Sequence, residues 1–373
     1  MQLYIFVMKA LVLEKKLQLS LRDIELPTDV NANDVKIKMH TVGICGSDVH
    51  YYTHGKIGPF VVKEPMVLGH EGSGIVIETG SEVSNLKVGD RVCIEPGVPE
   101  VNSKEYMKGI YNLDPKLTFW ATPPHHGCLT PEVVFPSNFV FKLPDNVSYA
   151  EGAMIEPLAV GLQAAEKAKI IPGETALVMG CGPIGLVIAL TALAGGCSKV
   201  FIADIVKEKL RMCDNYENLI PIDLVNENPI DIIKKHTDDW GANIIFEASG
   251  ATKAYDVIFE SICPAGKVVI VGNPMSAIPM DFATLLTKEI EIKTVFRYAH
   301  QYDRAISLLS SNKIDVKPMI RDSMRINVSI KAIEKANQTV PEDQRRDRPD
   351  RLHRCHARCT RAASHTWTPT RSK

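Results

Sequence analysis

The residues best suited to metal chemistry lie in two segments. Positions 43–51 (GICGSDVHY) read as a turn-rich stretch after a strand, and positions 69–74 (GHEGSG) as a glycine-flanked loop before a strand. Cys45, His70 and Glu71 offer a thiolate, an imidazole and a carboxylate, which are all ligands that zinc accepts in a tetrahedral site. Cys45 and His70 are 70 − 45 = 25 residues apart, so spacing alone does not bring them together. The residues leave two interpretations open: a zinc site, or a small buried cysteine and a hydrogen-bonded loop histidine.

A second group of residues predicts a nucleotide site. Gly180, Gly182 and Gly185 form a GxGxxG pattern, and Asp204 follows Gly185 by 204 − 185 = 19 residues. The glycines permit a tight turn, close approach to a pyrophosphate and close packing of the following helix, whose N-terminus favours phosphate. A carboxylate binds a ribose 2′-hydroxyl and repels a 2′-phosphate, so we expect NAD rather than NADP. A tight turn without a ligand is the alternative.

The two groups lie in stretches of different character. Residues 8–145 read as β-rich, with short apolar segments between Gly and Pro turns. After residue 151 helices and strands alternate, which predicts a parallel sheet covered on both faces. The expected strands are 10–13, 35–40, 74–78, 91–95, 133–135, 139–142, 175–179, 199–203, 244–247, 267–271 and 289–294, and the expected helices are 152–169, 183–194 and 302–311.

Composition excludes several classes of protein. The 373 residues and 41.2 kDa suggest about two domains. The net charge of 43 − 44 = −1 predicts neither a nucleic-acid nor a membrane partner, although residues 344–373 carry +7 and the remainder −8. The nine cysteines are an odd, scattered set without need of disulfides, which indicates a reducing, cytoplasmic location. We expect no membrane span and no signal peptide, with residues 1–7 a leader before a start at Met8.

Taken together, the motifs resemble the zinc-dependent medium-chain alcohol dehydrogenase/reductase family, and most closely its polyol branch of sorbitol and xylitol dehydrogenases. The resemblance covers about residues 8–342. It is carried by 43–52 (GICGSDVHYY), 69–74 (GHEGSG), 89–92 (GDRV), 95–99 (EPGVP), 111–113 (YNL), 121–124 (ATPP), 142–147 (KLPDNV), 156–158 (EPL), 180–185 (GCGPIG) and 295–298 (VFRY).

The resemblance implies an α/β fold. A β-rich GroES-like catalytic domain would comprise residues 1–157 and 295–343, and a Rossmann domain with a doubly wound parallel sheet would comprise residues 158–294. Residues 344–373 match nothing in the family and are expected to be disordered, with metal binding at Cys355, His356 and Cys359 or nucleic-acid binding as alternatives. The family's last catalytic-domain strand, expected after 335–342, is missing, which raises the alternative of a catalytically impaired NAD-binding product.

The resemblance also implies roles for individual residues. Cys45, His70 and Glu71 would hold one catalytic zinc. Glu156 would hold the water that completes the zinc shell or bind the metal itself, and Asp48 would orient His70. Ser47 and His50 would relay a proton towards solvent, although His50 has the alternative of an ordinary surface histidine. Ordinary packing is likewise the alternative for Tyr51, Phe119 and Tyr298. The implied polyol contacts are Tyr51, Phe119, Glu156, Arg297 and Tyr298, and the implied NAD contacts are Gly180, Gly182, Ile184, Gly185, Asp204, Lys209, Gly272 and Phe296.

The expected reaction is oxidation of xylitol, sorbitol or L-iditol to the 2-ketose, with 2,3-butanediol or L-threonine as alternative substrates. Many family members hold a second, structural zinc with four cysteines, but the matching positions here are Glu100, Ser103, Tyr106 and Asp114. We therefore expect no structural zinc and a lobe held by packing alone. A homo-oligomer, dimer or tetramer, is expected through an edge strand near 275–280.

Overall fold

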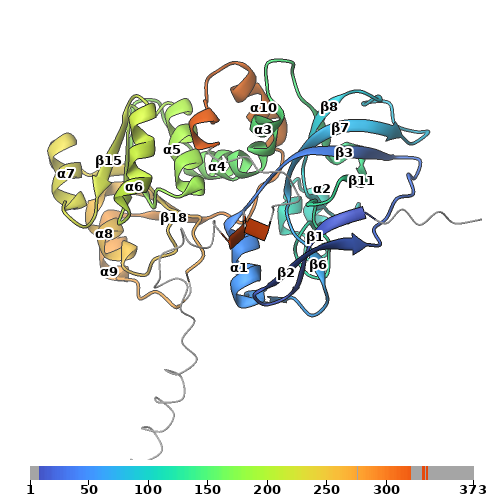
Figure 1. Ribbon diagram of the computed structural model, residues 1–373. Helices are drawn as coiled ribbons and strands as arrows, with labels where there is room; N and C mark the ends of the chain where they lie inside the picture. Colours follow the sequence, from blue (N-terminus) through green and yellow to red (C-terminus); the bar gives the residue numbers. More distant parts are fainter. Residues whose placement is uncertain (1–7, 275, 321–329, 332, 335–373) are drawn as a thin grey trace, which may run out of the picture.

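The computed structural model describes residues 8–274, 276–320, 330–331 and 333–334. The predicted leader, the C-terminal tail and the position of the missing final strand lie outside this part of the chain. Figure 1 shows the N-terminal strands on one side of the molecule and the parallel sheet with its helices on the other.

The N-terminal half is built from antiparallel sheets. Five strands pair in the order β11-β3-β7-β8-β12, and three pair in the order β2-β1-β6. Two short pairs, β4 with β5 and β9 with β10, complete this half. The strands are β1 (Met8–Lys15), β2 (Gln18–Ile24), β3 (Asp34–Gly43), β4 (Lys56–Ile57), β5 (Phe60–Val61), β6 (Met66–Val67), β7 (Glu71–Thr79), β8 (Arg91–Ile94), β9 (Gly97–Val98), β10 (Thr118–Phe119), β11 (Glu132–Pro136) and β12 (Val140–Lys142).

The second half contains one six-stranded sheet with every strand parallel, in the order β15-β14-β13-β16-β17-β18. Neighbouring residues of β13 face opposite layers: Val178 packs in the core that includes helix α5, and Leu177 in the core that includes helix α8. The predicted doubly wound sheet is therefore confirmed. The strands are β13 (Thr175–Met179), β14 (Lys199–Asp204), β15 (Leu219–Asp223), β16 (Ala242–Glu247), β17 (Ile262–Ile270) and β18 (Glu291–Thr294).

The helices connect and cover these sheets. Helix α4 packs against both α5 and α10, in a core that also contains residues of the N-terminal half. The helical elements are α1 (Gly46–His54), α2 (Lys104–Met107), η1 (Tyr111–Leu113), η2 (Ser137–Phe139), α3 (Tyr149–Ala153), α4 (Ile155–Ala168), α5 (Pro183–Ala194), α6 (Lys207–Leu210), η3 (Arg211–Asn215), α7 (Pro229–His236), α8 (Ala254–Ser261), α9 (Phe282–Lys288), α10 (Tyr302–Ser310) and η4 (Lys317–Met319).

Three expectations about elements need correction. The helix expected at 152–169 is divided at Met154 into α3 and α4, since Pro157 has no N–H for a bond to the preceding turn and is tolerated only where a helix begins. The segment 46–54, read as turn-rich, forms α1. Residues 276–280 form no strand, and residue 275 lies outside the described chain.

The sequence predicted that packing alone holds the lobe between β9 and β10, and this prediction is wrong. Asp114 is 6% exposed and accepts hydrogen bonds from the N–H groups of Glu100 and Lys116, both at 2.9 Å. The Lys116 ammonium also lies 2.6 Å from the Glu100 carboxylate, and Ser103 caps α2. Polar side chains therefore organise the four positions at which many relatives place cysteines.

Candidate active site and metal centre

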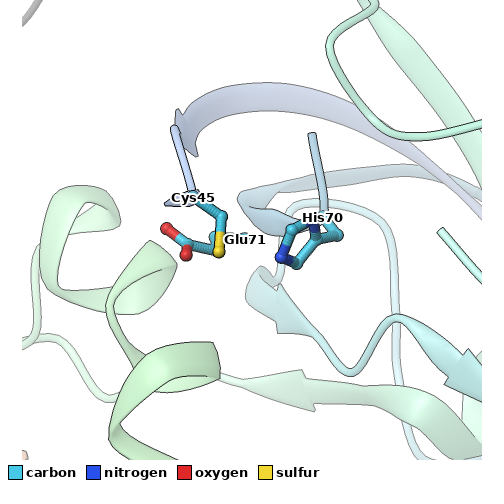
Figure 2. Close-up of side chains that lie close together, drawn as sticks. All are labelled: Cys45, His70 and Glu71. Atoms are coloured by element: carbon cyan, nitrogen blue, oxygen red, sulfur yellow. The ribbon is translucent and has the colours of Figure 1, made fainter. Parts of the chain in front are cut away.

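Strand pairing explains how the three candidate ligands meet. Cys45 lies two residues after the end of β3, while Glu71 begins β7 and His70 precedes it. The two strands are antiparallel, with Gly43 opposite Glu71 in the register. The ligand atoms of the three residues consequently lie within 4.8 Å of one another, and Figure 2 shows them around the same small space.

The charge and burial of this cluster fit a bound cation. His70 and Glu71 are 6% and 7% exposed, and His70 Nδ1 has no hydrogen-bond partner. Burial and the neighbouring Asp48 and Glu156 raise the pKa of the Cys45 thiol to about 11. Burial, with Cys45 and Glu156, also raises the pKa of Glu71 well above its ordinary value. The cluster therefore offers a soft sulfur, an imidazole nitrogen and a carboxylate at a place where burial makes negative charge unfavourable. This donor set suits zinc.

Asp48 hydrogen-bonds the backbone that carries the ligands. Burial lowers the pKa of His70, but the charges of Asp48 and of other nearby carboxylates outweigh burial and raise that pKa. The Asp48 carboxylate accepts from the Cys45 N–H at 3.0 Å and from the Gly69 N–H at 2.9 Å. Asp48 therefore ties the start of α1 to the loop before β7. This hydrogen bonding fixes both ligand-bearing segments while leaving His70 Nδ1 unpaired.

Glu156 lies beside this cluster but outside the group of three ligands. It is in the first turn of α4, and its Oε1 accepts a hydrogen bond from the Tyr298 hydroxyl at 2.8 Å. Burial raises the pKa of Glu156, while the nearby His70 opposes the shift. Glu156 thus joins the ligand cluster to the loop after β18.

The predicted polyol contacts lie together at the same place. The Arg297 guanidinium lies over the Phe119 ring, 3.8 Å from its centroid, and Tyr51 and Tyr298 are buried. Arg297 also lines a cavity of about 220 Å³. Its lining also includes Phe60, Asn112, Leu113, Asp114, Pro115, Leu117, Thr122 and Phe296, most of which the sequence reasoning did not assign to the site. The motifs at 111–113 and 121–124 were the signals that could have found Asn112 and Thr122.

The two residues predicted for proton relay are both on α1. Burial raises the pKa of the Cys45 thiol and Ser47 opposes that shift, so Ser47 lies at the ligand cluster. The His50 ring packs against His54, with ring centroids 4.9 Å apart. These positions are on the helix that begins at a metal ligand.

The predicted cofactor residues lie at the carboxyl ends of the parallel strands. Gly180 follows β13 and has a left-handed φ of 102°, and a Cβ on Gly185 would lie 1.8 Å from the Gly180 carbonyl oxygen. Asp204 ends the neighbouring strand β14 and accepts hydrogen bonds from the N–H groups of Cys181 and Val206, both at 2.8 Å. The glycine turn and its acid therefore meet at one edge of the sheet, where dinucleotides bind in this fold.

The remaining predicted cofactor residues surround this edge. Gly182 caps α5 and Ile184 packs on the core beneath it, while the Lys209 ammonium is 3.9 Å from Asp204. Gly272 lies two residues after β17, and a Cβ on Gly272 would lie 2.4 Å from Glu247 Oε2. Phe296 follows β18 and is 52% exposed.

Comparison with known proteins agrees with this geometry. Residues 31–145 match the alcohol dehydrogenase GroES-like domain, and residues 183–311 match the zinc-binding dehydrogenase domain. The chain is 49% identical to a D-xylulose reductase of Morganella morganii (90% of this chain, 99% of that protein) and 42% identical to the sorbitol dehydrogenase of Bos taurus (81% and 85%). A solved Escherichia coli oxidoreductase of unknown specificity superimposes with a TM-score of 0.84 at 34% identity, over 91% of this chain and 96% of that one.

These matches define the class: a dehydrogenase with a GroES-like domain and a Rossmann domain. The chain belongs to the zinc-dependent medium-chain dehydrogenase family and to its polyol branch. The predicted fold and cofactors, NAD and one zinc, are confirmed.

Proposed function

We propose that this chain catalyses the reversible NAD-dependent oxidation of a polyol to the corresponding 2-ketose, with xylitol, sorbitol or L-iditol as the substrate. The observation that carries the proposal is the cluster of Cys45, His70 and Glu71 beside the Arg297–Phe119 pair. The named relatives act on sugar-derived polyols and ketoses, which does not favour 2,3-butanediol or L-threonine. The alternative of a catalytically impaired product depends on the missing final strand and the C-terminal tail, and both lie outside the described residues.

Each group of side chains has a proposed role in the reaction. Cys45, His70 and Glu71 hold the zinc, and the turn from Gly180 to Gly185 with Asp204 holds NAD. When bound, the zinc supplies a Lewis acid towards the substrate oxygen, and NAD is the hydride acceptor. Arg297 and Glu156 orient the additional hydroxyls of a polyol, which a simple alcohol lacks. Ser47 and His50 remove the hydroxyl proton along α1 towards solvent.

One assay tests this function. NADH formation is measured over xylitol, sorbitol, L-iditol, 2,3-butanediol and L-threonine, with and without a zinc chelator. We expect a polyol to be the best substrate, with turnover lost on chelation and restored by zinc. Cys45→Ala should abolish turnover. Turnover that survives chelation, full activity of Cys45→Ala, or a preference for 2,3-butanediol or L-threonine would contradict the proposal.

We also propose the domain limits, assembly and location. The limits at residues 157/158 and 294/295 are supported by the parallel sheet, which runs from Thr175 to Thr294. A homo-oligomer is supported by the exposed apolar side chains of α9, where Phe282 and Leu286 are 68% and 76% exposed. Light scattering tests the assembly: a monomer at micromolar concentration would contradict it.

The proposed partner is a small polyol or ketose, with no nucleic acid and no membrane, in the cytoplasm. Within the described residues, no helix is long and apolar enough to cross a membrane. Cell fractionation with an antibody against the chain tests the proposed location.

A further inference from the structure

The loop that follows β18 carries Phe296, Arg297 and Tyr298, and its backbone is strained. Arg297 and His300 have left-handed φ values of 54° and 57°. Residues other than glycine adopt this conformation at a cost and keep it only where the surroundings impose it. Contacts from outside the loop must therefore hold it.

Two adjacent side chains of η1 supply such contacts. Asn112 Nδ2 donates a hydrogen bond to the Phe296 carbonyl oxygen at 2.7 Å, and the His300 N–H donates to the Tyr111 hydroxyl at 2.9 Å. The rings of Tyr111 and His300 also pack edge to face, 4.8 Å apart. Because the two bonds fall on either side of Arg297, they fix the segment that presents it.

Glu95 holds the Tyr111 hydroxyl from behind. That hydroxyl donates to Glu95 Oε1 at 2.7 Å, and Glu95 is 2% exposed at the end of β8. A phenol has one proton, so committing it to Glu95 leaves the oxygen lone pairs to accept from His300. Glu95, Tyr111, Arg297 and Tyr298 are among the residues that line a small cavity of about 10 Å³, so this pair and the loop meet there.

We propose that Tyr111 and Asn112, supported by Glu95, are positioning residues that set the specificity of the enzyme for polyols by holding the 296–300 loop. Asn112 also lines the cavity, and the contacts of both residues with the loop act through the placement of Arg297 and Tyr298. The inference deepens the proposed function, on which it rests, because it takes Arg297 and Tyr298 as the groups that meet the substrate hydroxyls.

The variants Tyr111→Phe and Asn112→Leu each remove one of the two hydrogen bonds to the loop. Tyr106→Phe is the matched control, since Tyr106 is on the same lobe and 37% exposed. Glu95→Gln keeps an acceptor for Tyr111 and should behave as the wild type, whereas Glu95→Leu should behave as Tyr111→Phe. Circular dichroism establishes that each variant is folded.

Two measurements are made on the full-length enzyme loaded with zinc: amide hydrogen exchange of the 295–301 peptide without substrate, and steady-state kinetics with xylitol and NAD. In Tyr111→Phe and Asn112→Leu we expect exchange of the loop to accelerate and KM for xylitol to rise about tenfold, as for loss of one buried hydrogen bond, with kcat changed by less than about twofold. Tyr106→Phe should match the wild type in both.

Three results would overturn the inference: loop exchange that is unchanged in both variants, faster exchange with an unchanged KM, or a fall in kcat at constant KM. Hydrogen exchange requires no turnover. A wild-type enzyme that oxidises no polyol therefore refutes the proposed function, while the exchange data still decide whether η1 holds the loop.

Discussion

Adding one methyl group at Gly43 should displace a metal ligand without replacing any of the three ligand residues. Gly43 is opposite Glu71 in the β3–β7 pair, and a Cβ there would lie 2.0 Å from Glu71 Oε2 and 3.0 Å from Glu71 Cβ. Since real Cβ contacts essentially never fall below 3.0 Å, the carboxylate oxygen must move by at least 3.0 − 2.0 = 1.0 Å. Ligand distances in metal sites are held to about 0.2 Å, so the movement removes Glu71 from its position.

For Gly43→Ala we expect zinc affinity to fall about 10- to 100-fold, the range seen when ligand orientation is lost. Competition with a colorimetric zinc chelator measures the affinity, and NADH formation from xylitol reports the consequence. Gly46→Ala is the matched control, because a Cβ there meets no heavy atom within 4 Å although Gly46 is next to Cys45. Zinc affinity of Gly43→Ala within about twofold of the wild type would refute the reasoning, as would an equal loss in Gly46→Ala.

Other consequences concern the cofactor, the lobe and the substrate pocket. Asp204→Ser should raise the ratio of kcat/KM for NADP over NAD at least about tenfold, because the charge that repels a 2′-phosphate is removed; steady-state kinetics with both cofactors measures the ratio, and an unchanged ratio contradicts the assignment. Asp114→Ala should lower the free energy of unfolding by about 1–3 kcal/mol in urea titrations, since two hydrogen bonds to a charged acceptor are lost. Glu100→Ala, which removes an exposed ion pair, should cost less than about 1 kcal/mol. Burial opposes ionisation of Asp114, but the Lys116 and Glu100 N–H donors outweigh it and hold its pKa below the ordinary 3.8. The stabilisation should therefore be complete above that value and be lost as the pH falls through the lowered pKa; identical urea midpoints against pH for wild type and Asp114→Asn would contradict this. Arg297→Lys should raise KM for xylitol about tenfold, because an ammonium cannot reproduce the planar group stacked on Phe119; an unchanged KM would remove Arg297 from the pocket.

The resemblance supplied the candidate residues of the active site, but their arrangement needed the sheet. Cys45 and His70 are 25 residues apart along the chain, and only the antiparallel register of β3 with β7 closes that interval. Helix α1 was likewise missed, since Val49, Tyr51 and Tyr52 have modest helix propensity, and the helix is fixed by Asp48 and by burial of Val49 and Tyr51. Tertiary contacts overrode the local pattern there.

The contacts of the lobe at 97–119 also depended on tertiary structure rather than on local sequence. From the sequence, four absent cysteines indicated only the loss of a zinc. The hydrogen bonds to Asp114 depend on how the chain folds back on itself, which one-dimensional spacing does not specify. The contacts of Tyr111 and Asn112 with the loop after β18 join residues more than 180 positions apart, so no local pattern could reveal them.

Local sequence was sufficient where structure repeats over a few residues. The strand at Thr175–Met179, the glycine turn, the helix at Pro183–Ala194 and the acid at Asp204 were all predictable, because glycine geometry and apolar periodicity act within one strand–helix–strand unit. The tertiary structure alone decided the metal cluster, the cavity beside Arg297 and the support of its loop, because those depend on strand register and on contacts between the two halves of the chain.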